Sequence, residues 1–220
     1  MDITRISRRG VMLRFTTGEA WDLNCYVIIG SQRAYLIDTG RGMDDARALD
    51  DAVRTLTALP LTVINTHYHW DHIWGNALFA DRPILAHYAC RELCVADYAL
   101  SMANPAVHPG GEAPLLPPNV LVCGELRFPC DAVRIFPVRG HTRDGLCVLD
   151  EEDGVLYAGD NVGDAPESPL PELEDSPEQY ALSLDAMERF PFALIASGHN
   201  LPMPRSFIER IRAELSQRHG

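Results

Sequence analysis

One dense run of metal-binding residue types constrains this chain more than any other feature of its sequence. Between residues 65 and 76 the chain reads N-T-H-Y-H-W-D-H-I-W-G-N, so an H-x-H-x-D-H pattern directly follows the apolar stretch 61–64. Imidazole nitrogens and carboxylate oxygens are ligands that Zn(II), Fe(II) and Mn(II) accept. Chance produces the four specified positions in roughly one chain of this composition in a thousand. The run therefore predicts a metal site that includes His67, His69, Asp71 and His72.

The local geometry of this run suits two adjacent cations. The apolar stretch 61–64 is predicted to be a short buried strand. His67 and His69 alternate along the extended chain that follows it, so both side chains can point the same way. Asp71 and His72 then open the turn into a helix. Six residues cannot fully ligate two metals, so further ligands must come from distant parts of the chain.

Three later residues are potential ligands that lie just past a predicted strand and directly after a glycine. They are His141, Asp160 and His199, which follow the predicted strands 133–136, 155–157 and 192–196. Glycine allows the backbone to approach a site closely, and loops at one edge of a rigid scaffold are where sites collect. Each of the three alone would be read as a structural residue. The upstream histidine run favours their assignment as the distant ligands.

Hydrophobic spacing and turn residues predict the remaining elements. We expect further strands at 11–15, 25–29, 33–37, 83–86, 126–128 and 146–149, and helices at 44–59, 88–101, 176–189 and 204–217. Residues 151–154 suit a hairpin turn. The segments 104–119 and 163–177 are predicted to be loops that border the pocket. Strands at both ends of the sequence, with helices between and after them, indicate two sheets between helix layers.

Composition and charge indicate which kinds of molecule the protein binds. A length of 220 residues predicts a single domain, 1–220. The formal net charge of −12 repels phosphate backbones and disfavours nucleic acid, and no apolar run is long enough for a membrane span. The first residues lack the pattern of a signal peptide, so we expect a cytoplasmic protein with a small-molecule substrate. The six cysteines are interpreted as buried free thiols.

The order of the seven candidate ligands resembles the metallo-β-lactamase superfamily. That family's signature is H-x-H-x-D-H, then a lone His, a bridging Asp and a final His. The resemblance implies an α+β fold, the four-layer αββα sandwich. It implies one metal on His67, His69 and His141, and a second on Asp71, His72 and His199. Asp160 would bridge the two metals.

The same resemblance implies a hydrolase with two divalent metal ions, with Zn(II) expected first and Fe or Mn as alternatives. A metal-bound hydroxide would attack a small ester, thioester or lactone-type substrate. Asp71 would be the catalytic residue that passes a proton to the leaving group. Asp38, in an acidic turn that also matches the family, either accepts a hydrogen bond from a ligand imidazole or only forms the turn. The aromatic residues among the ligands either wall the pocket or belong to the core; they are Tyr68, Trp70 and Trp74.

Departures from the pattern separate the branches of the family. True β-lactamases carry Cys or Ser at the position of Asp160. Hydroxyacylglutathione hydrolases have a further helical domain, for which the 200–220 segment is too short, and tRNA-processing nucleases need a basic arm. Lactonases remain compatible. Two readings from other classes also stay open, namely a mononuclear iron persulfide dioxygenase-like oxidoreductase and a non-catalytic metal-binding or sensor module.

Overall fold

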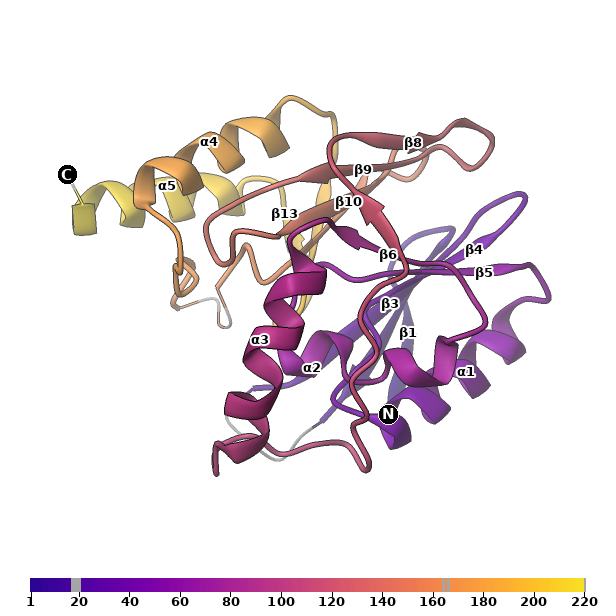
Figure 1. Ribbon diagram of the computed structural model, residues 1–220. Coiled ribbons are helices and arrows are strands. Elements are labelled where there is room, and N and C mark those ends of the chain that lie inside the picture. The colour runs from indigo at the N-terminus through magenta and orange to yellow at the C-terminus, as the bar shows by residue number, and fades with distance from the viewer. Residues whose placement is uncertain (17–20, 164, 166, 220) are drawn as a thin grey trace.

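The computed structural model describes residues 1–16, 21–163, 165 and 167–219, which form two mixed β-sheets packed face to face. Helices cover the outer face of each sheet, so the layers run helix, sheet, sheet, helix (Figure 1). This arrangement confirms the predicted αββα sandwich. The predicted loop 163–177 includes positions 164 and 166, which lie outside the described residues.

The first sheet contains seven strands in the order of the sequence. They are β1 (Asp2–Arg5), β2 (Gly10–Phe15), β3 (Leu23–Ile29), β4 (Ala34–Ile37), β5 (Leu61–Ile64), β6 (Ile84–His87) and β7 (Val120–Val122). Strands β1 to β4 are antiparallel, whereas β4 to β7 are parallel. Because parallel strands end at the same edge, the residues that follow β4, β5 and β6 lie near one another.

The second sheet contains six strands in the order β13-β12-β11-β10-β9-β8. These are β8 (Leu126–Phe128), β9 (Val133–Pro137), β10 (Leu146–Asp150), β11 (Val155–Gly159), β12 (Leu194–Ser197) and β13 (Met203–Pro204). Strands β11 and β12 are parallel, and Gly159 pairs with Ser197. The chain therefore leaves both strands side by side, with Asp160 next to the 198–199 turn.

Alternation along the strands builds the core. Tyr26 and Ile28 of β3 face the second sheet, whereas Cys25 and Val27 face the helix layer. Strand side chains point to opposite faces in turn, so each sheet is apolar on both sides. The ring of Tyr26 meets that of Tyr157 from β11 edge to face, with centroids 5.2 Å apart.

The helices pack on the two outer faces. Helix α1 (Met43–Leu56) lies against the first sheet, together with the short 3₁₀ helix η1 (Asn76–Phe79). The one-turn helix α2 (Trp70–Ile73) packs against α3 (Cys90–Ala103). Helices α4 (Pro177–Glu188) and α5 (Phe207–His219) cover the second sheet. Within the described residues no helix is both long and apolar enough to cross a bilayer.

Most predicted elements occur within two or three residues of their expected bounds. Strand β7 at 120–122 was not predicted, and three other differences have clear causes. Strand β1 was not predicted because its four residues are polar or exposed and stay at the sheet edge. The helix expected over 44–59 ends at Leu56, since Thr57 is extended and Pro60 disfavours helical backbone at the residue before it. The helix expected from 204 starts at Phe207, because Pro204 pairs with Leu194 in β13.

The cysteines do not form disulfides. All six are free, as expected, and Cys25, Cys90, Cys94 and Cys147 are buried. Cys123 and Cys130 are exposed, so the interpretation of every cysteine as a buried thiol is wrong for these two.

Candidate metal centre

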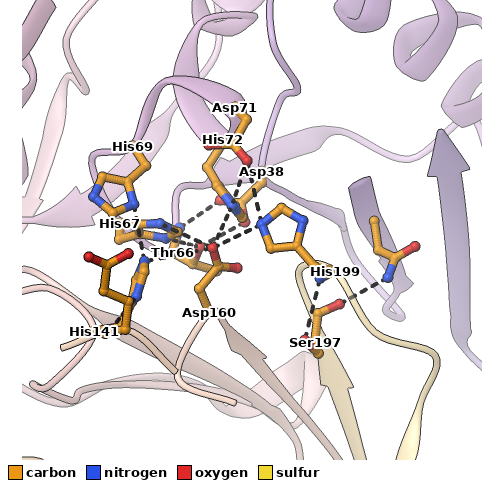
Figure 2. A network of polar contacts seen from close by, with 12 residues as sticks. Asp38, Thr66, His67, His69, Asp71, His72, His141, Asp160, Ser197 and His199 are labelled. Atoms are coloured by element: carbon orange, nitrogen blue, oxygen red, sulfur yellow. Dashed lines mark hydrogen bonds and ion pairs between the residues drawn. The ribbon is translucent and has the colours of Figure 1, made fainter. Parts of the chain in front are cut away.

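The seven candidate ligands meet at one edge of the two sheets (Figure 2). His67 follows β5, and the one-turn helix α2 carries Asp71 and His72. The second sheet supplies His141 after β9, Asp160 after β11 and His199 after β12. Strand ends from both sheets thus bring the seven side chains together.

Potential ligand atoms fall into two groups, each within 4.8 Å of one another. One group is His67, His69, His141 and Asp160, and the other is Asp71, His72 and His199. The resemblance divides the six other side chains in the same way but places Asp160 between the two groups.

The carboxylate of Asp160 lies at the centre of both groups. Its Oδ2 is 3.0 Å from Nε2 of His199 and 3.2 Å from Nε2 of His72. The same oxygen is 3.7 Å from Nε2 of His67 and 3.7 Å from Nε2 of His141. One oxygen therefore faces nitrogens of both groups, which is the position that a bridging ligand occupies.

A glycine makes this convergence possible. A Cβ atom on Gly198 would lie 2.1 Å from Oδ1 of Asp160 and 2.8 Å from Cε1 of His72. Any larger residue would displace one of these two side chains. The glycine before His199 is thus required by the close approach of β12 to the site.

Hydrogen bonds to the outer nitrogens fix how the imidazoles face the centre. Nδ1 of His199 lies 2.8 Å from the carbonyl oxygen of Asp22, and Nδ1 of His141 lies 2.9 Å from that of Glu172. A carbonyl oxygen only accepts, so both Nδ1 atoms carry the proton. In the neutral ring Nε2 then presents its lone pair to the centre.

His69 faces the centre with the other nitrogen. Its Nε2 lies 2.9 Å from Oε1 of Glu174, so it donates to that carboxylate. Its Nδ1 is 3.0 Å from Nε2 of His141. In the neutral rings two lone pairs would face each other at this distance. Such a contact needs a proton or a cation between the nitrogens.

Several buried polar atoms have no hydrogen-bond partner among the described residues. They include Nε2 of His67, Nε2 of His72 and Oδ1 of Asp160. An unsatisfied buried polar group costs about 1–3 kcal/mol, so such atoms are uncommon in a protein core. Nitrogen and carboxylate donors of this kind match the ligand preference of divalent zinc, iron and manganese. The residues present therefore fit two divalent cations.

Without cations, the charges of the site depend on one another. Burial lowers the pKa of His67 well below its ordinary value, and it also lowers that of His141. Burial acts in the same direction on His199, but the Asp160 carboxylate outweighs it and raises this pKa to about 9. Burial favours the neutral form of Asp160, yet His199 and His72 hold its pKa well below the usual range. His67 and His141 are thus neutral, whereas His199 carries a positive charge beside the Asp160 carboxylate.

Asp38 both forms its turn and contacts a ligand. Its backbone is left-handed, with φ of 63°, and Oδ2 lies 2.8 Å from Nδ1 of His72. The same carboxylate accepts hydrogen bonds from the amide and the hydroxyl of Thr66, each at 2.7 Å. The two roles that the sequence left open therefore coexist.

The aromatic residues of the histidine run divide between core and site. Trp74 is buried against Ile73 and Cys94. Tyr68 and Trp70 are half-buried, and Trp70 meets Trp21 edge to face with centroids 6.2 Å apart. Trp21 in turn packs against the His199 ring at 4.9 Å. Sequence reasoning missed Trp21 and Glu174 because neither stands in a recognisable pattern.

Comparison with known proteins agrees with this geometry. The family profile described as the metallo-beta-lactamase superfamily matches residues 19–199. The chain belongs to this superfamily. Solved structures of similar fold include TMB-1, with a TM-score of 0.79, 16% identity and coverage of 100% of this chain and 98% of that chain. The DIM-1 metallo-beta-lactamase gives a TM-score of 0.77 at 16% identity, covering 99% of this chain and 97% of its own.

Curated relatives of this chain include proteins with the names of two kinds of thioesterase. The acyl-coenzyme A thioesterase MBLAC2 of Gallus gallus is 28% identical over 164 residues, which cover 64% of this chain and 58% of the relative. The atrochrysone carboxyl ACP thioesterase of Aspergillus terreus is 26% identical over 141 residues, covering 63% of this chain and 38% of the relative. This chain therefore aligns with little more than half of the first relative's length and less of the second's.

Proposed function

We propose that this chain is a hydrolase of small acyl thioesters that uses two divalent cations. The convergence of seven metal-binding side chains carries the proposal, because Nε2 of His67, Nε2 of His72 and Oδ1 of Asp160 are buried there without a hydrogen-bond partner among the described residues. The names of the two relatives support thioesters as the substrate class. Coenzyme A and acyl carrier proteins both present the acyl group on the thiol of a phosphopantetheine arm.

His67, His69 and His141 would hold one cation, and Asp71, His72 and His199 would hold the other, with Asp160 between them. When bound, the cations would lower the pKa of a coordinated water and polarise the thioester carbonyl. Zn(II) is our first expectation for both positions, with Fe or Mn as alternatives. The completeness of both groups favours two cations over the mononuclear iron site of a persulfide dioxygenase.

The residues around the cations would orient the reaction. The carboxylates of Asp38 and Glu174 and the carbonyls of Asp22 and Glu172 hold four imidazoles in place, so little reorganisation is needed during turnover. Asp71 would assist departure of the thiol with a proton at Oδ2. An ordinary thiol has a pKa of about 8.5, so a thiolate leaves with little such help. We therefore assign Asp71 mainly to metal binding when the substrate is a thioester.

Metal analysis and a substrate panel together test this function. Purified protein should contain about two metals per chain and hydrolyse acyl-coenzyme A faster than lactone, phosphodiester or β-lactam substrates. Asp160→Ala should lose one or both metals together with hydrolysis, whereas Asp81→Asn, an exposed change elsewhere, should behave as the wild type. Full thioesterase activity with a single metal would contradict the two-cation site. Absence of thioester hydrolysis by fully metallated protein would contradict the substrate class.

A further inference from the structure

A polar cavity lies beside the candidate metal centre. Its volume is about 350 Å³, and its lining residues are His87, Tyr88, Ala89, Glu92, Arg139 and Arg143. Arg139 and Arg143 each stand two residues from the metal-centre residue His141, so their Cα atoms lie within about 7 Å of its Cα. His87 ends β6, which runs parallel to β5 and finishes at the same sheet edge as His67. The cavity and the centre therefore share one edge of the fold.

The two arginines of this cavity differ in their bonding. The guanidinium of Arg139 donates to Asp175 through Nε and Nη2, both at 2.7 Å, which fixes its position. Arg143 is exposed and makes no hydrogen bond or ion pair with any residue that the structure describes. Glu92 is the carboxylate among the lining residues. Arg143 thus leaves a guanidinium available to a ligand, in a chain whose net charge is −12.

Two further features of the cavity, the N-terminus of α3 and the imidazole of His87, favour an anion despite the carboxylate of Glu92. Helix α3 begins at Cys90 without a side-chain cap, and its N-cap residue Ala89 lines the cavity, whereas the carboxylate of Glu92 in its first turn acts against an anion. Free amides and the helix dipole make such an end favourable for negative charge. The imidazole of His87 is nine-tenths buried, and its Nδ1 accepts from the amide of Ala89 at 3.4 Å. Its Nε2 is then the protonated nitrogen, a neutral donor in the cavity wall.

We propose that this cavity binds the phosphate groups of coenzyme A and so selects acyl-coenzyme A among thioesters. This inference rests on the proposed thioesterase function. Guanidinium groups pair with phosphate oxygens through two parallel hydrogen bonds, which makes arginine the residue best suited to the task. Phosphates held between Arg139 and Arg143 would leave the pantetheine arm to reach the centre past His141.

Binding of an unreactive ligand tests the cavity separately from catalysis. Dethio-coenzyme A carries the phosphates but no thiol, and dethio-pantetheine lacks the phosphates. Wild-type protein should bind the first at least about tenfold more tightly in calorimetry, and Arg143→Gln should lose about tenfold for that ligand alone. Arg47→Gln removes an exposed arginine of α1 that pairs with Asp44, and it should leave both affinities unchanged. Equal zinc content in all variants shows that His141 is undisturbed.

Kinetics separate this proposal from the function on which it rests. Arg143→Gln should raise KM for acyl-coenzyme A with little change in kcat, and should leave acyl-pantetheine hydrolysis unchanged. If thioesters are hydrolysed but wild type and Arg143→Gln bind dethio-coenzyme A equally, the phosphate site is wrong and the thioesterase stands. The phosphate site is equally wrong if the thioester of an acyl carrier protein is hydrolysed while dethio-coenzyme A binds no more tightly than dethio-pantetheine. Arg143-dependent binding without any thioester hydrolysis would keep the cavity and reject the thioesterase.

Discussion

The carboxylate of Glu174 accepts a hydrogen bond from Nε2 of His69 at 2.9 Å. The same oxygen also accepts from the hydroxyl of Tyr68 at 2.8 Å, and the Glu174 amide donates to the carbonyl of His141 at 3.1 Å. One residue of the 163–177 loop thus touches two residues of the first metal group. This contact shows that the loop borders the site, as the sequence predicted.

Replacing Glu174 should weaken the first metal position. Glu174→Gln keeps the shape of the side chain but removes the charge that holds His69 with Nδ1 toward the centre. Loss of the residue that accepts a hydrogen bond from a metal-binding histidine typically lowers metal affinity 10- to 100-fold. We expect a loss of about that size for one of two zinc ions in competition with a chromophoric chelator. Tyr68→Phe keeps the His69–Glu174 bond and should bind zinc as the wild type does; equal affinity in both variants would refute this role.

Asp38 should have the corresponding effect on the second metal position. Asp38→Asn suits the left-handed backbone, because asparagine tolerates that conformation. The variant loses one of two acceptor oxygens that serve Thr66 and His72. Zinc content after dialysis against a weak chelator should fall from about two toward one per chain. Thr66→Ser retains the hydroxyl and provides the matched control; retention of two zinc ions by Asp38→Asn would contradict the assignment.

The sequence indicates the seven side chains that meet in the candidate metal centre better than it indicates the surroundings of that centre. Four candidate ligands stand within six residues, and His141, Asp160 and His199 each follow a strand and a glycine, so the order of residues along the chain is enough to indicate them. Glu174 and Trp21 carry no such signal, because their contacts depend on how loops from separate elements fold back. The backbone carbonyls of Asp22 and Glu172 are even harder to predict from the sequence. Every residue has a carbonyl, and only the folded course of the chain places these two next to imidazoles.

The same distinction holds for the fold. Buried strands such as β5 are predicted from their apolar residues alone. Strand β1 and the two-residue β13 form because a neighbouring strand offers hydrogen bonds, so their own residues do not indicate them. The parallel pairing of β11 with β12 brings Asp160 close to His199. It also depends on helix α4, which connects the two strands in the sequence and packs against their sheet.

Removal of the cations should destabilise the protein. A ligand present at about 1,000 times its dissociation constant stabilises the folded state by about 4 kcal/mol. For a chain of this size 1 kcal/mol corresponds to about 2–4 °C in Tm, so a chelator should lower Tm by on the order of 10 °C. Scanning calorimetry of Asp160→Ala with and without chelator is the control, and its two values should differ by less than those of the wild type, because this variant has lost one or both metals. An unchanged Tm in chelated wild type would show that the folded state does not bind the cations tightly.

Asp131 should make the stability of the sandwich depend on acid pH. It lies in the 3₁₀ helix η2 (Pro129–Asp131) before β9, yet it accepts hydrogen bonds from residues of the other sheet. Oδ1 accepts from the amides of Ser31 and Gln32, each at 2.7 Å, and Oδ2 accepts from the hydroxyl of Tyr35 at 2.8 Å. The buried carboxylate therefore joins the β3–β4 turn to the second sheet.

The direction of that pH dependence follows from the charge state of Asp131. Burial acts to raise its pKa, but the hydrogen bonds from Gln32, Tyr35 and Ser31 outweigh burial and lower it below the usual 3.8. The stabilisation is therefore complete above pH 3.8 and is lost as the pH falls through the lower pKa of the folded state. Asp131→Asn should reduce the free energy of unfolding at pH 7 by about 1.5–3 kcal/mol, and the difference from wild type should shrink below pH 4. Urea denaturation at both pH values measures it, with Asp81→Asn, whose side chain is 83% exposed, as the control. A difference that stays constant with pH would mean that the charge of Asp131 does not join the sheets.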